Sequence, residues 1–240
     1  MIELRRPVGR YARVGHRGAS ALAPENTPEA FALAVELGCD MLEFDVLAQS
    51  DGTVVVTHDA HRRHDPGVVT LDDALAFFAE RLPDVGLQVD LKRRGIEEAV
   101  IAALRRHGVL GRSWVSGFDA DSLRRVAELE PTLPRSFTLP RDRFGVSKRG
   151  PLAPLVRAAL RSLGSSLPRR IPTVLARARA TALTLHYSVT SEEAISCAHE
   201  VGAPVYVWTV DDPEAVERFV RWGADGIITN DPRVFTGLTT

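Results

Sequence analysis

The feature that most constrains the fold is a regular alternation of short β-rich runs with amphipathic stretches, which continues almost from end to end. The β-rich runs are residues 11–15, 41–46, 86–90, 113–116, 183–186, 204–209 and 226–229. The helical patterns lie at residues 27–37, 71–78, 96–107, 120–129, 191–201 and 213–222. One strand for roughly every 25 to 30 residues, followed by a helix, is typical of a parallel sheet covered by helices.

Over 240 residues this pattern predicts a single domain, residues 1–240, with the α/β fold of a TIM-type (β/α)8 barrel. A doubly wound open sheet is the alternative, but no glycine-rich turn of the dinucleotide-binding type follows the first strand. The barrel needs an eighth strand, which we place at residues 135–139, inside the least regular part of the chain, residues 131–172. An outer helix is also expected there, because six apolar residues recur at helical spacing: Leu152, Leu155, Val156, Ala159, Leu160 and Leu163.

The composition excludes several classes of protein. With 45% hydrophobic residues, 25% charged residues and a net charge of −1, the chain has the profile of an ordinary globular protein. Cys39 and Cys197 lie far apart inside helix-like stretches, so we expect free core thiols and neither a disulfide framework nor a zinc cluster. No signal-peptide region and no run of roughly 18 apolar residues is present, so we expect a cytoplasmic protein.

The charge is unevenly distributed along the chain. Residues 135–179 contain eleven Arg or Lys residues and one acid, Asp142. Such a block could attract an anionic membrane surface, but a solvated arginine-rich face is the favoured interpretation. We expect no nucleic-acid partner.

The first strand is followed by a motif suited to phosphate chemistry, His16-Arg17-Gly18, and then by Pro24-Glu25-Asn26-Thr27 at the start of a helix. A histidine can transfer protons near neutral pH, and the arginine beside it offers a fork of donors that matches phosphate oxygens. Gly18 permits close approach of the backbone, and a helix start favours negative charge nearby. An ordinary loop is the alternative for this motif taken alone.

Acidic residues end the next two strands of the pattern. Glu43 and Asp45 lie two positions apart, so both side chains point to one face of their strand, and Asp90 and Lys92 share a face of the following one. Neighbouring carboxylates repel each other unless a cation or shared proton relieves them, and a hard divalent ion such as Mg²⁺ or Ca²⁺ prefers such oxygens. Glu43, Asp45 and Asp90 are therefore candidate metal ligands, and Lys92 is a second cation for phosphate. An exposed acidic strand end and an Asp90–Lys92 salt bridge are the structural alternatives.

A second histidine is expected at the same rim. Asp51-Gly52 predicts a tight turn, after which a short strand at residues 53–57 returns the chain to His58-Asp59. Two histidines can divide the proton transfers, one accepting from the nucleophile and one donating to the leaving oxygen. On a late strand, Trp208 offers a flat wall to a substrate or fills the barrel interior.

Together these motifs resemble, in order, the signature of the glycerophosphodiester phosphodiesterase family. The resemblance spans residues 14 to 232 and rests on His16-Arg17-Gly18, Pro24-Glu25-Asn26-Thr27, Glu43-Phe44-Asp45-Val46, Asp51-Gly52, His58-Asp59, Asp90-Leu91-Lys92, Trp208-Thr209-Val210 and Gly223-Ala224-Asp225-Gly226-Ile227. It implies a TIM-type barrel, a Mg²⁺ or Ca²⁺ ion, and hydrolysis of glycerophosphodiesters to glycerol 3-phosphate and an alcohol.

The resemblance also implies roles for individual residues. His16 and His58 correspond to the catalytic acid and base pair, Glu43 and Asp45 to metal ligands, and Arg17 and Lys92 to the phosphate clamp. Two departures stand out: Asp90 replaces the family's usual glutamate, and the usual insertion after His58-Asp59 is largely absent. The main expectation is a small glycerophosphodiester substrate. A lysophospholipase D-like activity on lysophospholipids and a non-catalytic phosphate-binding barrel are the alternatives.

Overall fold

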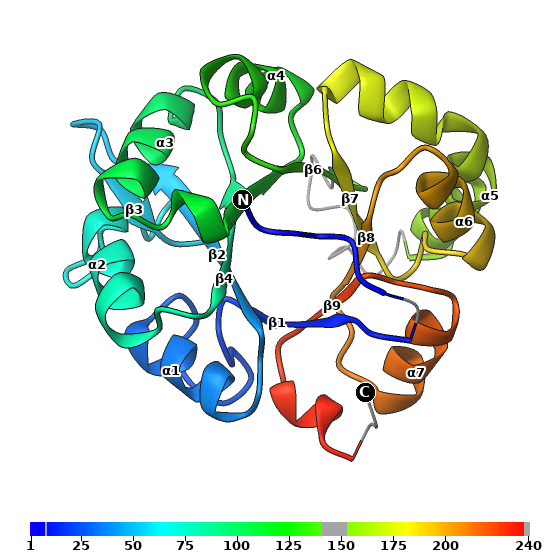
Figure 1. Cartoon of the computed structure of the whole chain (residues 1–240), viewed down its shortest axis with the longest axis horizontal. Helices are drawn as coiled ribbons and strands as arrows, with labels where there is room; N and C mark the ends of the chain where they lie inside the picture. Colours follow the sequence, from blue (N-terminus) through cyan, green and yellow to red (C-terminus); the bar gives the residue numbers. More distant parts are fainter. Residues whose placement is uncertain (8, 141–152, 238–240) are drawn as a thin grey trace.

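Eight parallel strands close into a barrel in the computed structural model of the chain, which describes residues 1–7, 9–140 and 153–237 (Figure 1). The barrel strands are β1 (Ala12–His16), β2 (Met41–Ala48), β4 (Gly86–Leu91), β5 (Ser113–Gly117), β6 (Arg135–Leu139), β7 (Ala182–His186), β8 (Val205–Trp208) and β9 (Gly226–Thr229). Each strand pairs in parallel with its neighbours, and the β1–β2 pairing closes the ring. The predicted barrel is confirmed, including its eighth strand, β6.

A ring of helices surrounds the barrel (Figure 1). These helices are α1 (Pro28–Glu36), α2 (Leu71–Arg81), α3 (Glu97–Arg106), α4 (Ala120–Leu129), α5 (Ala153–Ala178), α6 (Glu192–Glu200) and α7 (Pro213–Arg221). Most begin at a residue whose side-chain oxygen accepts a hydrogen bond from the first turn, as Thr27, Asp119 and Asp212 do. Such caps fix where each loop at the rim ends and where its helix begins.

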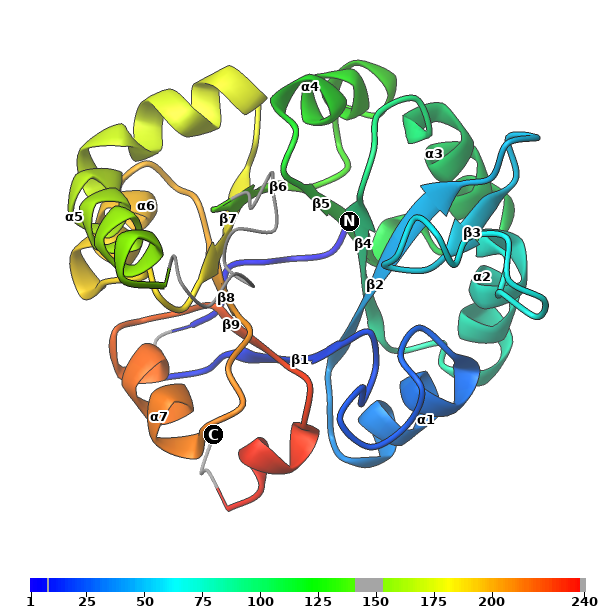
Figure 2. The same ribbon diagram turned by 180° about the vertical axis from the view of Figure 1, so that it is seen from behind.

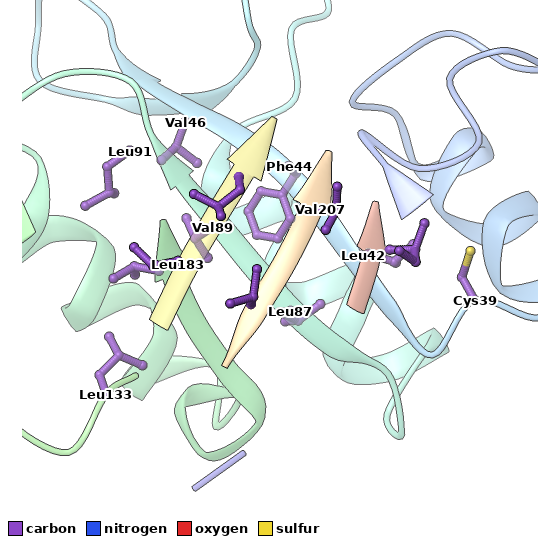
Figure 3. Close-up of a cluster of buried hydrophobic side chains, with 14 of the residues drawn as sticks. Cys39, Leu42, Phe44, Val46, Leu87, Val89, Leu91, Leu133, Leu183 and Val207 are labelled. Atoms are coloured by element: carbon purple, nitrogen blue, oxygen red, sulfur yellow. The ribbon is translucent and has the colours of Figure 1, made fainter. Parts of the chain in front are cut away.

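The pleat of the strands divides apolar from polar side chains. In β2, Leu42, Phe44 and Val46 point outward into the layer beneath the helices, where they are fully buried (Figure 3). Glu43 and Asp45 therefore point into the barrel, because successive side chains of a strand alternate between faces. The register places Asp45 beside Asp90 of β4, so the alternation predicted from sequence brings acids of two strands together.

The N-terminal segment lies across one end of the barrel, the end where the strands begin (Figure 1). Leu4 is buried there in a small cluster with Met41, Trp114 and Tyr206, and the Tyr206 hydroxyl donates to the Leu4 carbonyl at 3.1 Å. The opposite end, where the strands finish, carries the loops that follow each strand (Figure 2). The candidate site is at that second end, which is the usual position in barrels of this type.

Strand β3 (Val54–Val56) lies outside the barrel as an antiparallel ribbon on β2 (Figure 2). The turn between them contains Gly52 with a φ of 91°, a conformation that favours glycine. The ribbon leads the chain back toward the rim, because the backbone N–H of Thr57 donates to the Asp45 carbonyl at 3.0 Å. The hairpin predicted from Asp51-Gly52 is confirmed.

Helix α5 is longer than the sequence pattern indicated. We expected an outer helix marked by the apolar residues from Leu152 to Leu163, whereas α5 continues through Pro168 and Pro172 to Ala178. Of the predicted apolar stripe, Leu160 and Leu163 pack against the core and Ala159 does not, since it is exposed. The buried face continues to Leu167 and Ile171. Leu152, with the side chains of Leu155 and Val156, lies outside the described residues. Within the described ranges, no helix is both long and apolar enough to cross a bilayer.

Candidate active site

Three buried carboxylates form the centre of the site. Glu43, Asp45 and Asp90 each offer an oxygen, and these oxygens lie within 4.8 Å of one another. Burial, reinforced by the charge of Asp45, raises the pKa of Glu43 well above its usual range. Burial also acts to raise the pKa of Asp45, but Lys92 and Arg17 outweigh it, and the pKa falls below its usual range. Ionisation is therefore favoured at Asp45, which lies between fixed cations, and disfavoured at Glu43.

The two predicted phosphate-binding cations lie against this cluster. Lys92 Nζ is 2.5 Å from Asp45 Oδ1 and 2.6 Å from Asp90 Oδ2, and Arg17 Nε is 2.9 Å from Asp45 Oδ2. The Asp90–Lys92 salt bridge, which the sequence analysis gave as the structural alternative to a functional role, is therefore present, and it lies beside the carboxylate cluster. Despite its burial, the two aspartates raise the pKa of Lys92 above its ordinary value, so its positive charge is secure.

The loop after β1 presents Arg17 in an unusual backbone conformation. Arg17 has a φ of 57° and Gly18 a φ of 80°. The Arg17 backbone N–H donates to Glu43 Oε2 at 3.0 Å, while its guanidinium donates to Glu25 Oε2 at 2.7 Å. Asn26 also has a positive backbone φ. Its side-chain oxygen accepts a hydrogen bond from the Asp45 N–H and its side-chain amide donates to the Asp45 carboxylate, each at 3.2 Å. The sequence analysis placed Glu25 and Asn26 only at a helix start. In the structure, Glu25 orients the Arg17 guanidinium and Asn26 orients the Asp45 carboxylate.

His16 ends β1 and faces the carboxylate cluster. Its Nε2 is 3.8 Å from Glu43 Oε2, and its Nδ1 is 2.7 Å from Asn230 Oδ1. Burial lowers the pKa of His16 to about 4, so the imidazole is neutral at physiological pH. The Asn230 amide donates from Nδ2 to Asp211 Oδ2 at 2.6 Å, which orients its oxygen toward His16. An oxygen can only accept, so Nδ1 of His16 carries the proton and Nε2 has a free lone pair.

His58 lies on the loop that follows the β3 ribbon. Its Nδ1 is 3.0 Å from Asp59 Oδ1, and 35% of its side chain is exposed, against 13% for His16. Burial acts to raise the pKa of Asp59, but the hydrogen bond to His58 and the nearby cationic groups together outweigh it and lower the pKa, so Asp59 is a charged partner for the ring. The structure thus gives the two histidines different environments: one buried and neutral, the other open and next to a carboxylate.

Known proteins resemble this chain over nearly its whole length. The profile of the glycerophosphoryl diester phosphodiesterase family matches residues 16–74 and 62–234. A glycerophosphodiester phosphodiesterase of Caldanaerobacter subterraneus is 30% identical over an alignment covering 94% of this chain and 96% of the relative. The chain belongs to the glycerophosphoryl diester phosphodiesterase family. Its relatives are phosphoric diester hydrolases, and this chain is an enzyme of that class.

Solved structures of the family share the barrel. The glycerophosphodiester phosphodiesterase of Thermotoga maritima superposes with a TM-score of 0.72 at 24% identity, covering 96% of this chain and 99% of that one. A phosphodiesterase of Oleispira antarctica, solved with sn-glycerol-3-phosphate, gives a TM-score of 0.68 at 22% identity, covering 92% and 94%. At these identities the likeness supports the fold.

Trp208 lies at the mouth in an aromatic group that the sequence did not reveal. Its ring is edge-on to those of His186 and Phe118, with centroids 5.1 Å and 5.9 Å away. Lys92 Nζ lies 5.8 Å from the Phe118 ring centroid, which joins this aromatic group to the charged cluster. Trp208 also packs against the cluster inside the barrel, which agrees with the interior-filling alternative, while its role as a substrate wall stays a prediction.

Asn230 and Asp211 are the site residues of this family member that sequence reasoning missed. Both follow the ends of late strands, and Asn230 stands in the run Thr229-Asn230-Asp231-Pro232. Polar residues just after barrel strands lie at the functional rim, which is the signal that could have identified them. Without the fold, the same run indicates only a turn, because Asn, Asp and Pro all favour turns.

Proposed function

We propose that this enzyme hydrolyses glycerophosphodiesters, with a divalent metal ion, to glycerol 3-phosphate and an alcohol. The observation that carries the proposal is the convergence of Glu43, Asp45 and Asp90 with His16 at one rim. A phosphodiester is an anion, and cleaving it needs charge neutralisation and two proton transfers. The name of the Caldanaerobacter relative and the product bound to the Oleispira enzyme support the choice of substrate.

The donor set fits a hard divalent ion. Glu43, Asp45 and Asp90 supply carboxylate oxygens, which Mg²⁺ and Ca²⁺ prefer over nitrogen or sulfur. Asp90 Oδ1 accepts a hydrogen bond from Ser116 at 2.6 Å, which orients this carboxylate as a second layer of contacts does in metal sites. Bound there, the ion would neutralise non-bridging phosphate oxygens and favour deprotonation of the nucleophile.

The side chains of the site have complementary tasks. We assign His16 as the general base, because its proton is held on Nδ1 by Asn230 and the free Nε2 faces the cluster. We assign His58 as the general acid, because its Nδ1 is hydrogen-bonded to the Asp59 carboxylate, which orients the ring, and its side chain is open to the rim where a leaving alcohol would depart. Arg17 and Lys92 would hold the phosphate oxygens in line between the two rings. The nucleophile is either water or a neighbouring hydroxyl of the substrate.

A phosphate-binding barrel without catalysis would need the cations but not the paired histidines. The contrast between a buried neutral His16 and a partly exposed, carboxylate-paired His58 supports an acid and base pair. Within the described residues, no additional feature favours a lysophospholipid over a deacylated substrate. Small glycerophosphodiesters therefore remain the proposed substrates.

Product analysis tests the proposal. The purified enzyme would be incubated with glycerophosphocholine, glycerophosphoglycerol and lysophosphatidylcholine, each with Mg²⁺, Ca²⁺ or excess chelator. We expect glycerol 3-phosphate from the first two substrates in either metal, and none in chelator. A cyclic phosphate product would identify the hydroxyl route. Turnover of lysophosphatidylcholine alone would assign the lipid activity instead, and no turnover of any substrate would reject the hydrolase assignment.

A further inference from the structure

A cavity of about 460 Å³ opens beside the catalytic cluster, between the loops that follow β4 and β5. It is lined by Lys92, Arg93, Arg94 and Asp119. Its volume is within the roughly 300 to 1,000 Å³ typical of small-molecule sites. Three of the four lining residues that the structure describes are cationic, so an anion would be attracted to this cavity.

The charges of this cavity are unequally balanced. Lys92 is paired with two aspartates of the catalytic cluster, and Arg94 is paired with Asp119 at 2.7 Å and with Asp121 at 2.6 Å. Arg93 is exposed and has no ion pair with any residue that the structure describes. Among the described residues of the cavity, Arg93 is thus the guanidinium without an acidic partner, and its five N–H donors match phosphate or carboxylate oxygens.

The loop that carries these cations is held in place. Gly95, at a φ of 91°, donates its N–H to Glu97 Oε2 at 2.7 Å. Glu97 is buried and accepts a hydrogen bond from Ser122 of α4, which ties the loop to two helices. Lys92 N donates to the Val46 carbonyl at 3.3 Å, which anchors the other end of the loop to β2. A site built on an anchored loop loses little conformational entropy when it binds a ligand.

Lys92 belongs both to the catalytic cluster and to the cavity wall, so a phosphodiester held by Lys92 lies at the entrance of the cavity. This step rests on the proposed function. The glycerol 3-phosphate half is common to all glycerophosphodiesters, so any additional charge must lie on the alcohol half. We propose that the Lys92–Arg93–Arg94 cavity binds an anionic group on the alcohol half, and that the preferred substrates carry a second phosphate or a carboxylate there.

Matched substrates test this inference: glycerophosphoglycerol and the same compound bearing a terminal phosphate. We expect kcat/KM to be about tenfold higher for the phosphorylated compound, because one charge-assisted contact is gained. Arg93→Ala should bring the ratio close to one, mainly through KM, and leave glycerophosphoglycerol turnover within about twofold of wild type. Arg93→Lys should retain part of the preference. Arg221→Ala, an exposed arginine on α7, is the control and should leave the ratio unchanged.

Raising the ionic strength should reduce the preference in the wild type more than in Arg93→Ala, because salt screens exposed charges. Equal kcat/KM for the two compounds in the wild type, or an unchanged ratio in Arg93→Ala, would overturn the anion site and leave the proposed hydrolase intact. A higher kcat/KM for glycerophosphocholine than for the phosphorylated compound would also overturn it. Failure to hydrolyse any of these compounds would instead reject the proposed function, and the inference with it.

Discussion

Asn230 Oδ1 lies 2.7 Å from His16 Nδ1, and the Nδ2 of the same amide lies 2.6 Å from the Asp211 carboxylate. Asp211 also accepts from the Asn230 backbone N–H at 2.7 Å and from the Thr229 hydroxyl at 2.8 Å. Since the carboxylate fixes which end of the amide faces His16, the ring is held in one tautomer. Asn230 is therefore a positioning residue for the proposed general base.

Replacing Asn230 by Ala should lower kcat by roughly 10- to 100-fold with a smaller change in KM, because the His16 ring loses its orientation and tautomer. Replacing it by Asp should shift the acidic limb of the pH profile of kcat/KM upward, since a carboxylate favours the protonated ring. Steady-state kinetics between pH 4 and pH 9, taken at about half-unit steps, measure both effects. Identical profiles for wild type and Asn230→Asp would contradict the positioning role.

His16 should also make stability depend on pH. Burial lowers its pKa to about 4 from an ordinary value of 6.5, so the unfolded chain binds more protons than the folded one between these values. The contribution of His16 to the free energy of unfolding should thus be lost as pH falls through this window, by up to about 3 kcal/mol. Urea titrations in chelator, comparing wild type with His16→Gln, isolate the effect. Parallel curves for the two proteins would show that His16 titrates normally.

Removing one carboxylate from the cluster should abolish metal binding and leave the fold intact. Glu43→Gln keeps the size of the side chain but removes the charge from one of three oxygen ligands. We expect loss of activity and of Mg²⁺ or Ca²⁺ binding by calorimetry, with a melting temperature in chelator no lower than that of wild type. Full turnover of the wild type in excess chelator would contradict the metal assignment.

Gly18 should tolerate no side chain. Its φ is 80°, and an added Cβ would lie 2.5 Å from the carbonyl carbon of Ala30 in α1. Gly18→Ala should therefore destabilise the protein by about 2 kcal/mol or more and displace Arg17, with a rise in KM. Gly52→Ala is the matched control, because Gly52 has a similar φ of 91° but nothing within 4 Å of an added Cβ. Equal effects of the two substitutions on KM would show that Gly18 does not position Arg17.

The barrel itself was predictable because its strands and helices alternate regularly and because the pleat separates Leu42 and Phe44 from Glu43 and Asp45. Even the weak strand β6 could be placed, since a closed barrel needs eight strands. The length of helix α5 was underestimated, because a proline such as Pro168 normally ends a helix. Local sequence preference does not include the tertiary packing that allows the helix to continue past this proline.

The site was predictable where its residues share a strand, as Glu43 and Asp45 do. It was not predictable where contact depends on closure of the ring: Asn230 and His16 are 214 positions apart in the chain and meet only because β9 pairs with β1. The cavity beside Arg93 was missed for a related reason. A run of Lys and Arg in a sequence does not show which of the cations already has an acidic partner.

The two histidines differ in the stiffness of their supports. His16 ends a strand that is bonded on both sides within the closed barrel, whereas His58 follows β3, a ribbon outside the barrel that pairs with β2 along three residues and is bridged to Thr70 on its other side. Thermal motion of the ribbon would move His58 relative to His16 without straining the barrel. Substitutions in the ribbon are therefore expected to change the temperature dependence of turnover more than the melting temperature, which depends mainly on the barrel. Evolution or engineering could change these two properties of the enzyme independently.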